Sequence, residues 1–243
     1  MRHPRIYQEQ KLSANETITL DESAVAHLIK VLRLPEDSPI TLFNGDGNDY
    51  QAKLCNVSKK SAQAYISSVE PKETESPLNI HLGQGISRGE RMDFTLQKSV
   101  ELGVNTITPL FTERCGVKLN KERLIKKVEQ WQKIVISACE QSGRSIVPKV
   151  NAPLFLSDWL EQETQALKLN LHPKAHHSIM SLPIENNRVR LLIGPEGGLS
   201  DDEIKQASNA NFIDVLLGPR ILRTETAALT AITALQCRYG DLA

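Results

Sequence analysis

Two glycine-rich segments near the end of the sequence hold the residue types best suited to bind and transform a small molecule. Residues 191–200 read LLIGPEGGLS, and residues 217–227 read LGPRILRTETA. Each follows an apolar run typical of a buried strand and precedes a helical pattern, so each predicts a tight strand-to-helix turn. Two such turns favour a small-molecule pocket at the carboxyl ends of parallel strands. The alternative is that the glycines only make the turns.

The residue types in these turns exclude two common phosphate sites. Neither turn fits G-x-G-x-x-G, and neither contains the G-K-[ST] of a P-loop. The glycines leave bare backbone N–H and C=O groups, walled by Ile193, Leu217, Ile221 and Leu222. Apolar walls sandwich a flat heterocycle, and backbone groups hydrogen-bond to its edge. The pattern therefore predicts a pocket for an adenine-type ligand.

Alternating strand and helix patterns from Leu78 onward predict the sheet that positions the turns. Strands are expected at 78–83, 106–110, 167–171, 189–193 and 213–217. Helices are expected at 87–103, from about 120 to the segment 140–144, at 201–210 and at 226–239. Ser87 with Glu90, and Ser200 with Glu203, predict capping boxes. This alternation is typical of an α/β fold with a mainly parallel sheet covered by helices.

The first part of the sequence has a different pattern. Residues 1–72 are β-rich with one short helix, capped by Asp21 or Ser23, and strands are expected at 40–43, 50–57 and 62–69. This is the pattern of a small antiparallel barrel. The charged, proline-flanked segment 70–77 is typical of a linker. Two domains are therefore expected, at 1–72 and 73–243.

Composition narrows the class of protein. The 243 residues carry 29 Lys and Arg against 29 Asp and Glu, which argues against a sequence-independent nucleic-acid coat. No apolar run approaches the ~20 residues of a membrane span. The cysteines, Cys55, Cys115, Cys139 and Cys237, form no CxxC pair and are expected to be reduced thiols of a cytoplasmic protein. His172, His176 and His177 lack partners at ligand spacing, so no metal is expected.

The two glycine segments resemble the C-terminal signature segments of the SPOUT-class RNA methyltransferases. The resemblance extends over nearly the whole chain and includes SRGE at 87–90, QKSVELGV at 97–104, ERC at 113–115, EQSGR at 140–144 and LHP at 171–173. It is strongest to the bacterial enzymes that methylate N3 of a uridine in 16S rRNA. One departure is Cys115, where many members have serine, and this change is conservative.

The resemblance implies a fold, a cofactor and partners. The C-terminal domain would contain a deep trefoil knot, an exception to the rule that chains do not thread loops. The N-terminal barrel would be a PUA-like RNA-binding domain. The cofactor would be S-adenosyl-L-methionine, and the protein would act as a homodimer on the small ribosomal subunit. Alternatives are a SPOUT enzyme acting on another RNA or on a ribose 2′-hydroxyl, and a non-catalytic RNA-binding assembly factor.

Carried over by position, the resemblance implies a set of site residues. The cofactor-binding residues would be Leu171, His172, Pro173, Ile193, Gly194, Glu196, Gly197, Gly198, Leu217, Gly218, Ile221, Leu222, Thr224 and Ala228. For uridine-N3 methylation, Arg223 is the candidate that stabilises charge developing on the uracil oxygens. Glu225 either accepts the N3 proton, orients Arg223, or only favours the dipole of the last helix.

RNA contacts are inferred from charge. The candidates are Arg33 in the first domain and Arg88, Arg114, Lys118, Lys121 and Arg144 in the second. Phosphate contacts supply most of the affinity in such complexes. Arg144 has an alternative partner in Glu140, four residues earlier, if the helix continues through Gly143. For each side chain singly, an ordinary surface charge is the competing interpretation.

Overall fold

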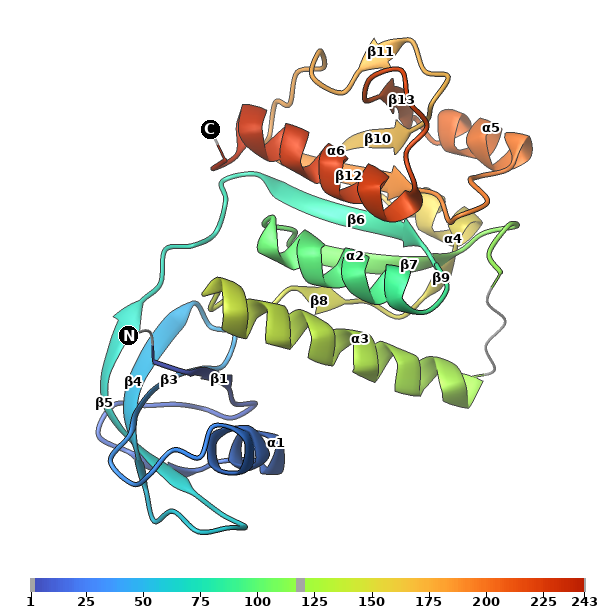
Figure 1. Ribbon diagram of the computed structural model, residues 1–243. Helices are drawn as coiled ribbons and strands as arrows, with labels where there is room; N and C mark the ends of the chain where they lie inside the picture. The colour runs from blue at the N-terminus through green and yellow to red at the C-terminus, as the bar shows by residue number, and fades with distance from the viewer. Residues whose placement is uncertain (1–2, 117–120, 243) are drawn as a thin grey trace. The chain divides into compact units, whose positions relative to one another are not determined.

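The computed structural model describes residues 3–116 and 121–242, with the side chain of Lys121 also left out (Figure 1). The described chain forms two compact units. The first unit runs to Glu75 and also takes in Cys139–Val147, and the second unit comprises Ser76–Ala138 and the chain from Pro148. The linker pattern predicted domains at 1–72 and 73–243. It did not predict that residues 139–147 belong to the first unit.

The first unit is a small, mostly antiparallel sheet beside a short helix. Its elements are β1 (Arg5–Tyr7), β2 (Thr17–Thr19), α1 (Glu22–Val25), the π-helix η1 (Ala26–Val31), β3 (Pro39–Phe43), β4 (Asn48–Cys55) and β5 (Gln63–Pro71), with strand order β1-β3-β4-β5-β2. Asp21 caps α1 as predicted, since its carboxylate accepts from the Ala24 N–H at 2.8 Å.

One edge of this sheet corrects the expectation of antiparallel pairing throughout. β1 pairs with β3 in parallel, with Ile6 opposite Leu42. Parallel neighbours need a long crossover, and here β2, α1 and η1 lie between them in the chain. The alternating apolar pattern gives the strand positions but not the direction in which an edge strand pairs.

The second unit is a three-layer α/β structure. The strands are β6 (Asn79–Gly85), β7 (Thr106–Phe111), β8 (Lys149–Val150), β9 (Leu154–Phe155), β10 (Leu167–Leu171), β11 (His177–Ser178), β12 (Arg188–Ile193) and β13 (Ile213–Leu216). Their order is β11-β13-β10-β12-β6-β7-β8, with β9 also on β7, and the pairs are parallel. The predicted mainly parallel sheet is confirmed; the trefoil knot stays a prediction.

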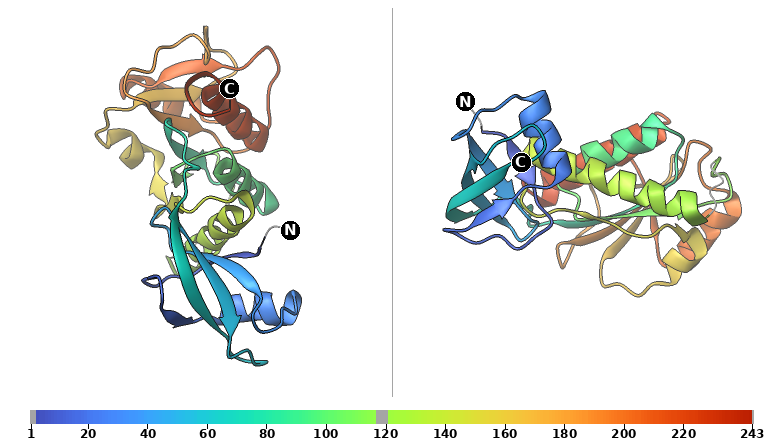
Figure 2. Two further views of the ribbon diagram at one scale, coloured as in Figure 1. Left: turned by 90° about the vertical axis from the view of Figure 1, so that its left-hand side faces the viewer. Right: turned by 90° about the horizontal axis from the view of Figure 1, so that it is seen from below.

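Helices cover both faces of this sheet (Figure 2). On one face lie α2 (Glu90–Glu101), α3 (Lys121–Ser142) and α6 (Thr224–Tyr239), and on the other lie α4 (Leu156–Glu161) and α5 (Asp201–Asn209). A buried cluster between the sheet and α4 and α5 includes Trp159, Leu192 and Phe212. Because both faces are covered, the central strands are near-continuous apolar runs.

The two predicted capping boxes have different outcomes. Ser200 and Glu203 form one at the start of α5, with both reciprocal hydrogen bonds present. Ser87 and Glu90 do not, because α2 begins after Gly89, whose φ is 53° and which makes no side-chain cap. The Ser87 hydroxyl donates instead to the Gly85 carbonyl at 3.3 Å. The spacing alone did not reveal that residues 86–89 form a loop before the helix.

A partly buried histidine, His81, predicts pH-dependent stability of the second unit. The His81 ring lies edge-on to Trp159 and bonds Thr108 Oγ1 at 2.8 Å, and Arg190 is its neighbour in register on β12. Burial, and secondarily the Arg190 charge, lowers the pKa of His81 from 6.5 to about 4. As the pH falls, the His81 ring of the unfolded chain binds a proton before the ring of the folded protein does. The stabilisation is therefore complete above pH 6.5 and is lost as the pH falls towards 4.

The expected loss is roughly 3 kcal/mol of unfolding free energy across that window. Denaturant titrations of the wild type and of His81→Gln, between about pH 7 and about pH 4, measure it. The variant should show a smaller decline with pH, because glutamine carries no titrating ring. Equal declines in the two proteins would show that His81 is not the group responsible.

Candidate functional site

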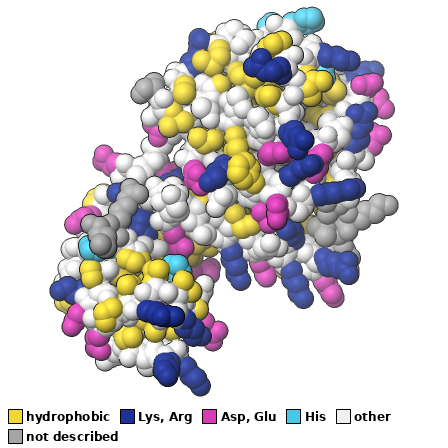
Figure 3. Space-filling view, in the orientation of Figure 1, with side chains coloured by type: hydrophobic (Ala, Val, Ile, Leu, Met, Phe, Trp, Pro, Cys, Tyr) yellow, Lys and Arg dark blue, Asp and Glu magenta, His cyan; other side chains and the backbone are white. Residues whose placement is uncertain are grey.

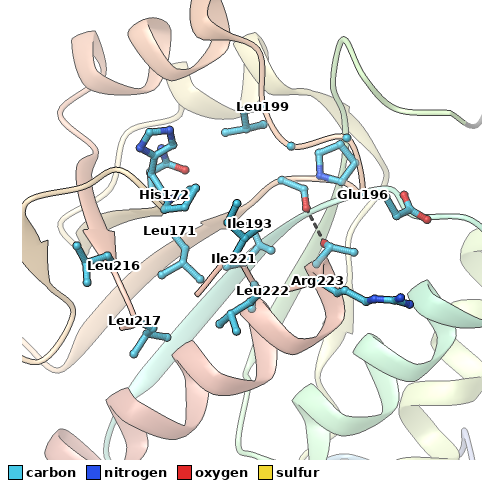
Figure 4. Close-up of a pocket in the computed structure, with 18 of the residues that line it drawn as sticks. Leu171, His172, Ile193, Glu196, Leu199, Leu216, Leu217, Ile221, Leu222 and Arg223 are labelled. Carbon is cyan, nitrogen blue, oxygen red and sulfur yellow. Dashed lines mark hydrogen bonds between the residues drawn. The ribbon is translucent and has the colours of Figure 1, made fainter. Parts of the chain in front are cut away.

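A cavity of about 570 Å³ opens at the carboxyl ends of β10, β12 and β13. Leu171, Ile193, Leu217 and Leu222 give it an apolar wall, and in Figure 4 their side chains gather on one side. Its remaining lining includes the charged residues Arg91, Arg114, Lys174, Glu196, Asp201, Arg220, Arg223 and Glu225. An apolar interior with a charged mouth suits a ligand that presents a flat ring inward and a reacting group outward.

The first glycine turn approaches neighbouring backbone too closely for side chains. A Cβ on Gly85, at the end of β6, would lie 2.5 Å from the Pro195 backbone nitrogen and 2.9 Å from the Gly194 carbonyl carbon. Gly198 has φ +68°, and no heavy atom lies within 4 Å of the position a Cβ would take there. The turn thus packs tightly against β6 while its glycine backbone borders open space.

A hydrogen-bonded bridge joins the two glycine turns. The Thr224 hydroxyl, at the start of α6, donates to the Gly194 carbonyl at 2.6 Å, drawn as a dashed line in Figure 4. The Gln84 amide in turn donates to the same hydroxyl at 2.9 Å. Thr224 is buried, so this bridge is protected from competition by water. Thr224 therefore positions the turns as well as lining the pocket.

The pocket brings together almost all the residues predicted to hold a cofactor. It is lined by Leu171, His172, Pro173, Ile193, Gly194, Glu196, Gly197, Gly198, Leu217, Gly218, Ile221, Leu222 and Thr224. Ala228 is the exception: its side chain is fully buried, and Ala227 lines the pocket in its place. Consecutive helix residues point about 100° apart, so a shift of one residue moves a side chain to another face.

Arg223 and Glu225 are two residues apart in sequence but differ in environment. Arg223 is exposed and stands at the N-cap position of α6, where its backbone carbonyl accepts from the Ala227 N–H at 2.7 Å. Figure 4 shows its side chain extending away from Leu171 and Leu217. Glu225 is partly buried, and within the described structure its Oε2 atom has no hydrogen-bond partner. Both residues line the cavity.

Glu196 turns outward from the glycine turn to the loop before α2. Its Oε1 atom accepts from the Arg88 backbone N–H at 2.9 Å and lies 3.4 Å from a guanidinium nitrogen of Arg91. Burial by itself raises the pKa of Glu196, but the hydrogen bonds from Arg88, its own N–H and Arg91 outweigh it, so the net pKa is lowered. The side chain is therefore a carboxylate at neutral pH.

The predicted RNA-contact residues fall into three groups. Arg33, Arg88 and Arg114 are exposed, and Arg114 also donates to the Gly197 and Leu199 carbonyls at 3.2 and 3.3 Å. Lys118 and the Lys121 side chain lie outside the described residues. Figure 3 shows cationic side chains gathered where α2 and α6 begin, mixed with acidic ones.

Arg144 is a correction to the predicted RNA contacts. Its side chain is only 4% exposed, its Nε donates to Glu75 at 2.9 Å, and its Nη2 forms an ion pair with the same carboxylate. It does not pair with Glu140, because α3 ends at Ser142 and Gly143 takes φ +88°. Glu140 accepts instead from the Tyr7 N–H at 3.1 Å. A buried, ion-paired guanidinium does not face phosphate in solution.

Several pocket residues were not predicted from the sequence. They are Arg91, Asn170, Lys174, Pro195, Leu199, Asp201, Ile204, Leu216, Arg220 and Ala227. Pro195, Leu199, Arg220 and Ala227 lie within the two glycine segments, and Asp201 and Leu216 directly adjoin them. Including every residue of those segments and their immediate neighbours would have found these six. Arg91 had no local signal, because α2 starts far from the turns in sequence and reaches the cavity only in the fold.

Among the described residues, no group of three or more His, Cys, Asp or Glu side chains is arranged to hold a metal ion. None of the described helices is both long and apolar enough to cross a bilayer.

Family models match both parts of the chain. An RNA methyltransferase domain matches residues 74–236, and an RNA methyltransferase PUA domain matches residues 20–66. A ribosomal RNA small subunit methyltransferase E of Buchnera aphidicola is 43% identical over 242 residues, covering 99% of this chain and 98% of the relative. The corresponding protein of Bacillus subtilis is 29% identical, covering 93% and 92%.

Two similar solved structures contain a cofactor. A methyltransferase from Legionella pneumophila in complex with SAM is 46% identical with a TM-score of 0.97, covering 100% of both chains. A ribosomal RNA small subunit methyltransferase E from Neisseria gonorrhoeae, bound to S-adenosyl methionine, is 43% identical with a TM-score of 0.93, again covering 100% of both chains.

Proposed function

The chain belongs to the RNA methyltransferase family that includes ribosomal RNA small subunit methyltransferase E, and we propose that it methylates N3 of a uridine in 16S rRNA. The methyl donor is S-adenosylmethionine. The observation that carries the proposal is the pocket built by the two glycine turns, in a chain that matches cofactor-bound relatives over its whole length. The protein acts as a homodimer on the small ribosomal subunit, and zero net charge favours the assembled particle over naked RNA.

The pocket fits this cofactor by its chemistry. No heavy atom lies within 4 Å of the position that a Cβ would take on Gly198 or Gly218. The backbone N–H and C=O groups there are therefore accessible to the edge of a ring. Leu171, Ile193 and Leu217 line the pocket and would cover the faces of the adenine ring and keep water away from it. When bound, S-adenosylmethionine supplies an electrophilic methyl carbon on its sulfonium.

The charged side chains of the pocket interact with the uracil of the substrate. As its N3 proton leaves, negative charge spreads over the flanking carbonyl oxygens. The exposed Arg223 guanidinium provides N–H donors to that charge. Glu225, with one oxygen lacking a partner within the described structure, accepts the proton or orients Arg223. The remaining work of the site is positioning, since the displacement requires nitrogen, methyl carbon and sulfur in line.

Isothermal titration calorimetry with S-adenosylmethionine tests the cofactor. We expect saturable binding with one site per chain. No detectable heat with well-folded protein would remove the methyltransferase proposal and favour a non-catalytic RNA-binding role.

Mass mapping of rRNA tests the substrate. RNA from cells lacking the protein should lose one uridine methylation in 16S rRNA, and purified protein should restore it on small subunits. Retention of every 16S uridine methylation, or a lost 2′-O-methyl group instead, would mean that another RNA or atom is the substrate.

A further inference from the structure

Three loops of the second unit are joined in a closed ring of contacts at the mouth of the pocket. They are residues 86–91 after β6, residues 112–116 after β7, and the first glycine turn, residues 194–200. We call these three segments the loop ring. All three lie within the second unit. Each loop contacts the other two through a named side chain.

Glu196 makes the first link of the loop ring. Its carboxylate reaches from the glycine turn to the Arg88 N–H at 2.9 Å and to the Arg91 guanidinium at 3.4 Å. Gly89 follows with φ +53°, so the chain bends sharply between Arg88 and the start of α2. A hydrogen bond to a backbone N–H fixes the position of the loop itself and not only of a side chain.

Arg88 and Arg114 complete the ring. The Arg88 guanidinium lies against Gly116, since a Cβ there would be 2.5 Å from its Nη2 atom. Arg114 donates back to the Gly197 and Leu199 carbonyls at 3.2 and 3.3 Å. Glu203 adds a further tie: one oxygen accepts from the Glu113 N–H at 2.7 Å and the other from the Ser200 N–H at 2.9 Å.

Glu196 therefore has a role different from that of the other residues in its turn. One group bonded to its Oε1 atom is the Arg88 N–H of the loop before α2, and the other is the Arg91 guanidinium in the first turn of α2. In Figure 4 Glu196 lies on the same side as Arg223, away from the apolar wall. Its negative charge also offsets the cations that line the mouth.

Building on the proposed function, we propose that Glu196 is a positioning residue for the RNA substrate. It holds the 86–91 loop on the glycine turn, so that Arg88 and Arg91 meet RNA phosphates at a fixed place beside the bound cofactor. Glu196 lines the pocket, but in this role its carboxylate binds the Arg88 N–H and the Arg91 guanidinium and does not hold the cofactor. Substrate affinity then depends on Glu196 more strongly than cofactor affinity does.

Glu196→Ala tests this division. We expect the KM for small subunits to rise about tenfold, the loss associated with a hydrogen bond to a charged group. The dissociation constant for S-adenosylmethionine should change by less than about threefold, because backbone and apolar groups supply its contacts. Glu196→Gln should raise the KM less than Glu196→Ala does. Its amide oxygen still accepts from the Arg88 N–H, whereas the charge attraction for Arg91 is lost.

Amide hydrogen exchange of the protein without ligands gives a readout independent of activity. The Arg88 N–H should be protected in the wild type and in Glu196→Gln, and should exchange much faster in Glu196→Ala. Glu90→Ala is the matched control, because Glu90 is an exposed carboxylate of the 86–91 segment and, among the described residues, forms no hydrogen bond or ion pair with the other two segments of the loop ring. It should leave both the KM and the Arg88 exchange rate unchanged.

The outcomes separate the two proposals. Equal losses of RNA and cofactor affinity in Glu196→Ala would mean that Glu196 holds the cofactor and would overturn the positioning role. Unchanged Arg88 exchange would overturn it as well. A wild-type protein that binds no S-adenosylmethionine would refute the proposed function, whereas the exchange experiment would still decide whether Glu196 holds the loop.

Discussion

Arg223→Ala is expected to lower kcat by roughly two to three orders of magnitude. The reason is that the exposed guanidinium at the start of α6 meets charge that exists only in the transition state. A donor lost from such a site affects kcat more than binding. The affinity for S-adenosylmethionine should therefore stay within about twofold of the wild type, since uncharged neighbours form the pocket wall. Single-turnover methylation of small subunits and calorimetry measure the two quantities separately.

Two further variants sharpen the test of Arg223. Arg223→Lys keeps the charge but loses the planar donor fork, so it should recover only part of kcat. Arg220→Ala removes an exposed guanidinium three residues away that also lines the pocket. It should raise the KM for small subunits with little change in kcat, as expected of a phosphate contact. A loss of cofactor affinity alone in Arg223→Ala would assign Arg223 to the cofactor pocket instead.

The role of Glu225 is tested with the variant Glu225→Gln in the same methylation reaction. If Glu225 accepts the N3 proton, Glu225→Gln should lower kcat by about two to four orders of magnitude, because an amide does not accept that proton. If Glu225 only orients Arg223, the loss should be smaller, because the amide oxygen still accepts from the guanidinium. The partly buried carboxylate, with one oxygen lacking a partner within the described structure, is compatible with either role.

The sequence predicted the parts of the fold that depend on local pattern. The strand at Leu167–Leu171 and the capping box of Ser200 and Glu203 are where periodicity and residue type placed them. The short helix α4 (Leu156–Glu161) and the two-residue strands were missed, because such short segments have no measurable period. The parallel pairing of β1 depends on a long-range contact that no local pattern records.

The sequence predicted those site residues that lie within the glycine turns themselves. The glycine segments identified nearly the whole apolar wall, because glycine and its apolar neighbours are adjacent in sequence. The errors arose where a residue's role depends on a distant partner. The sequence predicts Arg144 as an RNA contact, but its side chain pairs with Glu75, far away in sequence. Arg91 was missed for the same reason.

Gly85 is the clearest case of a site residue that only the fold reveals. It belongs to β6, far from either glycine segment in sequence, yet it packs against the backbone of the first turn. A Cβ at Gly85 would lie 2.5 Å from the Pro195 nitrogen and 2.7 Å from its Cδ atom. These are backbone and ring atoms, which cannot rotate away as a flexible side chain does. The turn itself must move.

Gly85→Ala is accordingly expected to weaken S-adenosylmethionine binding by about a hundredfold or more, because an ångström-scale shift of the turn misplaces several contacts at once. The matched control is Gly83→Ala on the same strand, whose Cβ would meet the Trp159 ring at 2.4 Å. That variant should lower the unfolding free energy by overpacking, by roughly 1–3 kcal/mol, yet leave the folded protein able to bind the cofactor. Calorimetry and denaturant titration on both variants distinguish a displaced turn from general destabilisation. If Gly85→Ala binds the cofactor as tightly as Gly83→Ala does, the close approach of β6 is not what holds the first turn in its binding conformation.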